Sequence, residues 1–478
     1  MAERTGKKEL LEVPAWSVPV VRTELPGQRS RELFDRFDRV ASNIQTDHSD
    51  VPFVEARRSE WLVEDVDGNT FADHVSAWGA DPLGPRHPHV LEAVERAQRD
   101  YGMECSMYVP SVASSELAIK LAEIAPEPLS RVAFEVTGTA TVETGVRLAR
   151  EATGRPMILA FYGQYHGESS YLAAGASTDL SEVPTQHAQY VTGLVFTPYP
   201  NRFRAPFHAG PGPYDDEMHL DYLEEWVLLH QVEPEQIAGV LIEPVLGEGG
   251  ILVPSEAFWK RLQEMCRKWG WKLILDEVQT CMGRCGTMFA AERYGIRPDI
   301  LLLAKGFAGG GQPIAAIVTT DEILGRTNLH IGSTYAWTPA AAAGALAGIE
   351  VLERGDVFRN VAQIERIAFE ELSPLVDRIE QVGDVRAAGA LVGVEFVRDQ
   401  QTIRPAPNFH RRVHQAAVRR GVLGITQWGK WVYRFQPALN MPPELFRWSC
   451  QTLAEAIEEV ALDPPPEPEL LIDRGEPA

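Results

Sequence analysis

The sequence has few cysteines, few basic residues relative to its acidic ones, and no long apolar run. The 478-residue chain has five cysteines, an odd number. Its first basic residues are not followed by an apolar stretch of secretory length. No disulfide framework is therefore expected. No run of about 18 apolar residues occurs, which argues against a membrane-spanning helix. The net charge of −22, from 45 basic and 67 acidic residues, argues against nucleic-acid and anionic-membrane partners. We therefore expect a soluble, cytoplasmic protein.

A metal site is not expected either. Cys281 and Cys285 are four positions apart, but no histidine or second cysteine pair stands near them with the spacing of a zinc site. The length leaves room for roughly two to three domains with ample core.

Two short apolar runs, residues 272–275 and 300–303, each lead to a charged residue. The runs have the length of strands buried on both faces, and the charged residues, Asp276 and Lys305, are 305 − 276 = 29 positions apart. One strand-crossover-strand unit takes about 30 residues, and ligands of open parallel sheets bind outside the carboxyl ends of the strands. An acid and an amine in one crevice suit a cofactor with a protonated ring nitrogen and an aldehyde. Taken alone, the pair is better explained as ordinary loop residues that flank buried strands.

The sequence around this pair carries a specific resemblance. The stretches LILDEVQT, GRCG and PDILLLAKGFAGGGQPIAA, in this order and spacing, resemble the signature of the class III pyridoxal-phosphate aminotransferases, and the resemblance covers roughly residues 73–439. It implies a fold-type I α/β enzyme, with a mixed, mostly parallel seven-stranded sheet covered by helices on both faces and a smaller α+β domain. It also implies that Lys305 holds pyridoxal 5'-phosphate as a Schiff base and shuttles a proton, while Asp276 stabilises the protonated ring.

The resemblance places a phosphate site at a predicted strand-to-helix turn. Residues 131–136 read as a strand, and Gly138 and Thr139, which follow it, align with the family's phosphate cup; a helix start offers free N–H groups there. Relatives usually have Glu at the next position, where this chain has Ala140. Thr334 aligns with the threonine that completes the phosphate site of the partner subunit, which implies a homodimer with shared active sites.

Further residues are implied to surround the cofactor ring. Tyr165, in the motif Tyr-His-Gly, aligns with the stacking aromatic, and His166 supports the ring. Val278 covers the other face and Gln279 reaches the ring hydroxyl. Cys281 replaces a usual Gly, and its effect stays open. With Glu243, the implied cofactor-binding set is Gly138, Thr139, Tyr165, His166, Glu243, Asp276, Val278, Gln279, Lys305 and Thr334.

Three residues are implied to contact the substrate. Arg434 stands at the family's substrate-carboxylate arginine, and Glu248 stands where family members acting on ω-amino groups carry a Glu that pairs with this arginine. Relatives typified by β-alanine:pyruvate transaminases have Ser there, so Glu248 favours an ω-amino donor. In the alternative interpretation, Glu248 is a solvated loop carboxylate and Arg434 a surface residue. Trp78 replaces an aliphatic residue and either narrows the substrate side or belongs to the core.

Four segments are predicted along the chain. Residues 1–72 form an N-terminal arm and hairpin that belong to the small domain, residues 73–345 the large cofactor domain, and residues 346–462 the C-terminal part of the small domain. Residues 463–478, rich in proline and acid, form a loosely ordered tail.

The predicted reaction is transamination from an amine or ω-amino acid to a 2-oxo acid such as pyruvate or 2-oxoglutarate. An epimerase, aminomutase or decarboxylase on the same fold is the alternative. A non-catalytic, degenerate fold is least favoured, because the residues expected for catalysis and cofactor binding include Lys305, Asp276, Gln279, Tyr165 and Thr334. The sequence specifies neither the donor, the acceptor nor the pathway.

Overall fold

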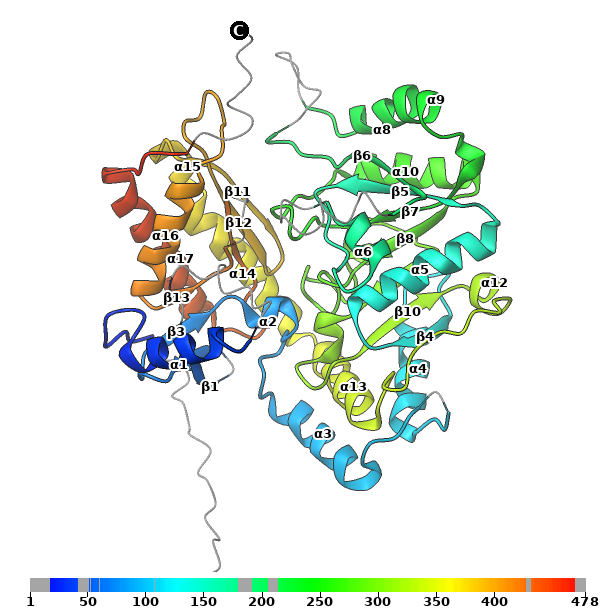
Figure 1. Ribbon diagram of the computed structural model, residues 1–478, viewed down its shortest axis with the longest axis horizontal. Coiled ribbons are helices and arrows are strands. Elements are labelled where there is room, and N and C mark those ends of the chain that lie inside the picture. Colours follow the sequence, from blue (N-terminus) through cyan, green and yellow to red (C-terminus); the bar gives the residue numbers. More distant parts are fainter. Residues whose placement is uncertain are drawn as a thin grey trace, which may run out of the picture.

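The computed structural model describes residues 18–41, 51, 53–59, 61–106, 108–178, 191–204, 214–426 and 431–468. The chain forms two lobes, a large one built on a seven-stranded sheet and a smaller one built from both ends of the described chain (Figure 1). Most of the predicted tail, residues 469–478, lies outside the described residues. No helix within the described ranges is long and apolar enough to cross a membrane.

The large sheet has the strand order β4-β10-β9-β8-β7-β5-β6. Every neighbouring pair from β9 to β6 is parallel, and β10 runs antiparallel to both of its neighbours. The predicted mixed, mostly parallel sheet is therefore confirmed. Its strands are β4 (Arg131–Glu135), β5 (Met157–Tyr162), β6 (Leu194–Pro198), β7 (Ile237–Ile242), β8 (Lys272–Asp276), β9 (Ile300–Leu303) and β10 (Ala315–Thr319).

Helices cover both faces of this sheet because the interiors of its central strands are apolar on both sides. In β8, Ile274 faces helix α5 (Gly138–Thr153), while Leu273 and Leu275 join the core on the side of α10 (Glu256–Trp269). Each buried Leu or Ile side chain contributes about 1.5–3 kcal/mol. Helix α5 lies so close that a Cβ at Gly145 would stand 2.8 Å from the Leu302 side chain.

Capping residues mark the ends of these helices. Helix α10 begins after Ser255, whose hydroxyl accepts a hydrogen bond from the N–H of Phe258 (3.2 Å), and ends at Gly270 in a left-handed conformation. Helix α5 ends in the same way at Gly154.

The small lobe contains two sheets. The first has the order β1-β2-β3-β13, with β1 (Glu55–Arg58), β2 (Leu62–Asp65), β3 (Thr70–Asp73) and β13 (Val422–Leu423), so an N-terminal hairpin pairs with a C-terminal strand. The second has the order β11-β12-β14, with β11 (Val382–Ala388), β12 (Leu391–Phe396) and β14 (Val432–Phe435).

The remaining helices surround these sheets, and α2 lies between the two lobes (Figure 1). They are α1 (Gln28–Asp38), α2 (Ser76–Gly79), α3 (Pro88–Tyr101), α4 (Val112–Ile124), α6 (Tyr171–Ala176), α8 (Met218–Tyr222), α9 (Leu228–His230), α11 (Ala290–Tyr294), α12 (Asp321–Leu324), α13 (Pro339–Glu353), α14 (Asp356–Leu372), α15 (Pro374–Arg378), α16 (Pro407–Arg419) and α17 (Pro443–Leu462).

The domain boundaries stay a proposal. The predicted division after residue 345 falls inside α13, which packs against α3 and α4 of the large lobe along its length, so we propose that the small domain resumes after Glu353. The part of the predicted tail that the structure describes, residues 463–468, is bonded to α16: the Glu467 carboxylate accepts hydrogen bonds from the N–H groups of Asn408 (2.9 Å) and Phe409 (2.8 Å).

Candidate active site

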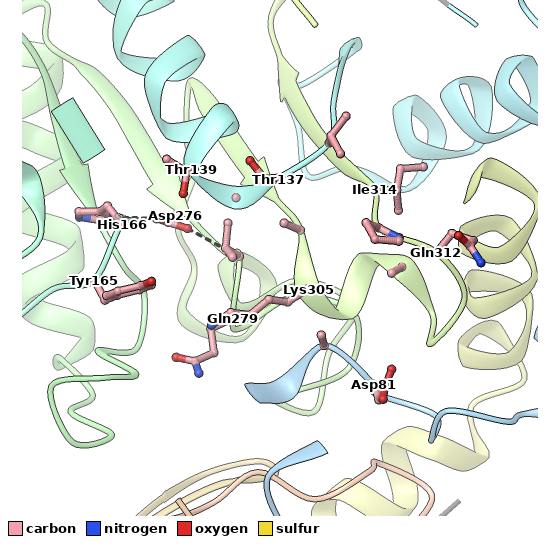
Figure 2. A pocket seen from close by; sticks show the side chains of 18 of the residues that line it. Asp81, Thr137, Thr139, Tyr165, His166, Asp276, Gln279, Lys305, Gln312 and Ile314 are labelled. Atoms are coloured by element: carbon pink, nitrogen blue, oxygen red, sulfur yellow. Dashed lines mark hydrogen bonds and ion pairs between the residues drawn. The ribbon is translucent and has the colours of Figure 1, made fainter. Parts of the chain in front are cut away.

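A cavity of about 400 Å³ lies at the carboxyl ends of the central strands (Figure 2). Asp276, the last residue of β8, and Lys305, two residues after β9, both line it. Lys305 holds a left-handed backbone conformation (φ 44°), which is uncommon for a residue with a side chain and is typical of functional sites. Its burial lowers the pKa of the Lys305 amine, although Glu248, Glu243 and Asp276 act in the opposite direction.

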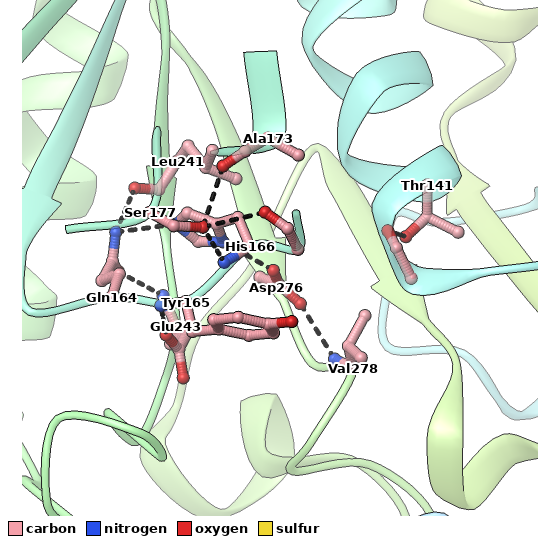
Figure 3. A network of polar contacts seen from close by, with 12 residues as sticks. Thr141, Gln164, Tyr165, His166, Ala173, Ser177, Leu241, Glu243, Asp276 and Val278 are labelled. Atoms are coloured by element: carbon pink, nitrogen blue, oxygen red, sulfur yellow. Dashed lines mark hydrogen bonds and ion pairs between the residues drawn. The ribbon is translucent and has the colours of Figure 1, made fainter. Parts of the chain in front are cut away.

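The Asp276 carboxylate is buried and held by two donors (Figure 3). Its Oδ1 accepts a hydrogen bond from the N–H of Val278 (3.0 Å), and its Oδ2 lies 2.7 Å from Nδ1 of His166. Both contacts orient the carboxylate at the wall of the cavity.

The tautomer of His166 follows from its other neighbour, Gln164. Oε1 of Gln164 accepts a hydrogen bond from the N–H of Glu243 (2.7 Å), so the amide nitrogen is the group that faces the carbonyl of Leu241 (3.2 Å) and Nε2 of His166 (2.9 Å). Because the amide donates, Nε2 of His166 accepts. Nδ1 therefore carries the proton and donates to Asp276.

Glu243 lies below this network, at the end of β7. Its carboxylate accepts hydrogen bonds from the N–H groups of Tyr165 (2.9 Å) and Gly247 (3.0 Å). Burial raises the pKa of Glu243 to about 7. The ring of Tyr165 borders the cavity (Figures 2 and 3), and Glu243 fixes the backbone that carries it.

The N-terminus of α5 forms the opposite end of the cavity. Gly138 and Thr139 line it, and the hydroxyl of Thr137 caps the helix by accepting from the N–H of Ala140 (3.2 Å). A Cβ at Gly138 would stand 3.0 Å from the side chain of Val278, so glycine keeps this wall open. A helix start of this kind suits an anionic group.

Gln279 lies beside Lys305 and is held from two sides. Its Nε2 donates a hydrogen bond to Oε1 of Gln436 (3.1 Å). Its Oε1 packs against the backbone of Gly247, so closely that a Cβ at position 247 would stand only 1.6 Å from this oxygen. Any side chain at position 247 would displace Gln279.

Glu248 and Arg434 form an ion pair just outside the cavity lining. Nη2 of Arg434 lies 2.7 Å from Oε2 of Glu248, and its Nη1 donates to the carbonyl of Gly247 (2.9 Å). Arg434 is 1% exposed and Glu248 4% exposed, so the alternative of a solvated carboxylate and a surface arginine is wrong. Both charges act on the Lys305 amine.

Trp78 and Thr334, two further predicted residues, are also not among the residues that line the cavity. Trp78 is half-buried on the α2 bend, where Ser76, Ala77 and Trp78 all have positive φ, and it is not one of the buried core residues. Thr334 is exposed on the turn that precedes α13. The other nine predicted cofactor-binding residues line the cavity together.

The sequence did not identify three polar residues of this region. Asp81 lines the cavity, and burial raises its pKa to about 6. Gln164 and Gln436 fix the orientation of His166 and Gln279. The proximity of Gln164 to the motif Tyr-His-Gly was the one available signal, since nothing marks an isolated Gln or Asp.

Comparisons with known proteins agree on one family. The family model described as "Aminotransferase class-III" matches residues 44–457. An alanine/serine racemase of Pyrococcus horikoshii is 31% identical over 94% of this chain and 94% of its own length, and a 4-aminobutyrate aminotransferase of Mycobacterium leprae is 33% identical over 88% and 94%. The solved structure of an amine transaminase from an uncultivated Pseudomonas species, in its PLP-bound form, is 28% identical over 88% of this chain and 97% of that chain, with a TM-score of 0.79.

Proposed function

The chain belongs to the class III aminotransferases, and we propose that it moves an amino group from a donor without an α-carboxylate, an amine or ω-amino acid, to a 2-oxo acid such as pyruvate or 2-oxoglutarate. As a PLP-dependent transaminase of fold type I, it uses pyridoxal 5'-phosphate as its cofactor. Bound PLP supplies an aldehyde that condenses with amines and a cationic ring that withdraws electrons.

The residues around the cavity fit this cofactor. The start of α5 offers N–H groups to the phosphate, Asp276 offers a carboxylate to the ring nitrogen, and Lys305 offers an amine to the aldehyde. Tyr165 and Val278 offer an aromatic and an apolar side chain to the two ring faces.

Lys305 is the proposed catalytic base. Its Nζ would hold the cofactor through the aldehyde and would be the group that moves a proton at the substrate carbon. The lowered pKa of the Lys305 amine favours the neutral form that can accept this proton.

Asp276 is the proposed partner of the ring nitrogen. The proton on Nδ1 of His166 stabilises the negative charge of Asp276, and this carboxylate would keep the ring nitrogen of the bound cofactor protonated. Gln279, oriented by Gln436, is the proposed donor to the ring hydroxyl.

The Glu248–Arg434 ion pair carries the proposal for the donor class. An oxo acid needs the bidentate fork of Arg434 for its carboxylate. A donor without an α-carboxylate would leave a buried arginine uncompensated, unless Glu248 pairs with it. We infer that Arg434 alternates between Glu248 and the oxo acid.

Replacing Glu248 tests this inference. Glu248→Ala should reduce kcat/KM for a donor without an α-carboxylate by about 100-fold or more, because a buried charge without its partner costs about 3–5 kcal/mol. The same variant should leave an α-amino acid donor much less affected, and Arg434→Ala should chiefly raise the KM for the oxo acid. Glu256→Ala, at the exposed start of α10, is the matched control. Equal losses for both donor classes in Glu248→Ala would return the donor class to unknown.

Racemisation is a second candidate, favoured by the 31% identity to an alanine/serine racemase. The two reactions differ when an L-amino acid is supplied without an oxo acid. A racemase would form the D-enantiomer continuously, whereas a transaminase stops after one turnover per site. Chiral chromatography of such a mixture with L-alanine separates them.

We also propose a cytoplasmic homodimer. The segment around the start of α4 exposes apolar side chains at Met103, Tyr108, Val109 and Val112, which favours an interface. Thr334 would then face the partner's cofactor. All five cysteines are free thiols, which supports a reducing compartment.

A further inference from the structure

The turn that carries Glu248 is held at both ends by arginines of the small lobe. Nη1 of Arg434, on β14, donates to the carbonyl of Gly247 (2.9 Å), and Nε of Arg386, on β11, donates to the carbonyl of Gly250 (2.9 Å). Both strands belong to the three-stranded sheet. The position of Glu248 therefore depends on contacts made far away in the sequence.

Arg386 is itself firmly placed. Its Nη1 bonds Asp384 (3.0 Å), and its Nη2 lies 2.6 Å from Oε2 of Glu395. Glu395 is buried and also pairs with Nε of Arg204 (2.5 Å). Burial acts to raise the pKa of Glu395, but the charges of Arg386 and Arg204 outweigh it and lower this pKa. Glu395 is thus an anionic anchor for Arg386.

The turn also has no free space against the small lobe. Gly250 has a φ of 110°, and a Cβ there would lie 3.0 Å from the side chain of Val432 and 3.3 Å from Nη2 of Arg386. A Cβ at Gly393 would lie 3.4 Å from the carbonyl of Gly250. The hydrogen bond from Arg386 therefore holds a turn that already packs closely against β12 and β14 of the small lobe.

In the proposed reaction Arg434 must move, whereas Arg386 can stay in place. When Arg434 turns to the oxo acid, it leaves both Glu248 and the carbonyl of Gly247, whereas Arg386 has no reason to move. We propose that Arg386 is a specificity-determining positioning residue that holds the turn while Arg434 is away, so that Glu248 is in place when Arg434 returns. This inference rests on the proposed alternation of Arg434.

The experiment uses the PLP-loaded enzyme and the ratio of kcat/KM for an ω-amino donor to that for an α-amino donor. Arg386→Met should lower this ratio about tenfold or more, since it removes a hydrogen bond from a charged donor that positions Glu248. Arg204→Met is the matched control: it removes the other arginine from Glu395 but makes no contact with the turn, so the ratio should stay unchanged. Arg386→Lys, which keeps the charge beside Glu395 but lacks the fork that serves three acceptors, should fold even where Arg386→Met does not, and should lower the ratio as well.

A second readout does not depend on turnover. Hydrogen–deuterium exchange of the peptide covering residues 244–252 should be faster in the Arg386 variants than in Arg204→Met. In a Glu248→Ala background, Arg386→Met should lower the ratio no further, because both changes act on the same pairing.

The outcomes separate the inference from the proposed function. If Glu248→Ala does not change the ratio, the proposed alternation of Arg434 is wrong and the donor class returns to unknown. If Glu248→Ala lowers the ratio but the Arg386 variants leave both the ratio and the exchange of this peptide unchanged, only the role of Arg386 is overturned.

Discussion

The substitution Asp276→Asn tests the hydrogen-bond network around this carboxylate as well as its charge. The new amide has one oxygen and one NH₂ group where the carboxylate had two oxygens. The N–H of Val278 needs the oxygen, because a backbone donor cannot change its role. The NH₂ group must then face Nδ1 of His166, which already carries a proton.

His166 cannot relieve this conflict by changing its tautomer. A proton on Nε2 would face the amide nitrogen of Gln164, and that amide cannot rotate because its oxygen is bonded to the N–H of Glu243 and its nitrogen to the carbonyl of Leu241. One buried donor is left without an acceptor. Such a group costs about 1–3 kcal/mol, so the free energy of unfolding should fall by that amount.

The assay is urea unfolding of the cofactor-free protein at neutral pH, in single and double variants. His166→Phe removes the conflicting donor, so Asp276→Asn should cost little in that background, and the coupling energy should be about 1–3 kcal/mol. The loaded Asp276→Asn enzyme should also lose about 100-fold or more in rate, since the ring nitrogen loses its anion. An equal cost of Asp276→Asn with and without His166 would refute the assigned tautomer, and near-native turnover would mean that another group holds the ring nitrogen.

Two further predictions concern stability and assembly. Burial lowers the pKa of His74 to about 3 and that of His414 to about 4, and neither ring has a hydrogen-bond partner within the described residues. The unfolded chain, with a pKa of about 6.5, binds more protons, so the stability that these residues contribute is complete above about pH 6.5 and falls as the pH drops, by about 4 kcal/mol for the pair at pH 5. Urea unfolding between about pH 5 and pH 7 should show that the free energy of unfolding depends less steeply on pH after His74→Phe and His414→Phe. An unchanged dependence on pH would contradict the prediction. Sedimentation should show a dimer in the active enzyme, and a fully active monomer would exclude the proposed role of Thr334 across the interface.

The sequence was informative where the signal is local. The apolar runs that became β8 and β9 are patterns within a few residues, and burial on both faces specifies these two strands. The position of Asp276 and Lys305 at one edge of the sheet followed from strand direction alone.

The contacts that hold the site were not predictable in this way. Arg434 and Gly247 are 187 positions apart, and Arg386 and Gly250 are 136 apart. Arg434 was identified only through the family resemblance, and nothing in the sequence marks Arg386. The left-handed conformation of Ser76, Ala77 and Trp78 was not predictable either, since only the residue that follows them, Gly79, is of a type that favours positive φ.

The role of Lys305 is the central claim, and one measurement tests it directly. Borohydride reduction of the PLP-loaded enzyme, followed by proteolysis and mass spectrometry, should find the mass of the cofactor on the peptide that contains Lys305. Lys305→Ala should lose turnover and this covalent label while retaining some cofactor. Label on another lysine, such as Lys272 at the start of β8, would contradict the assignment.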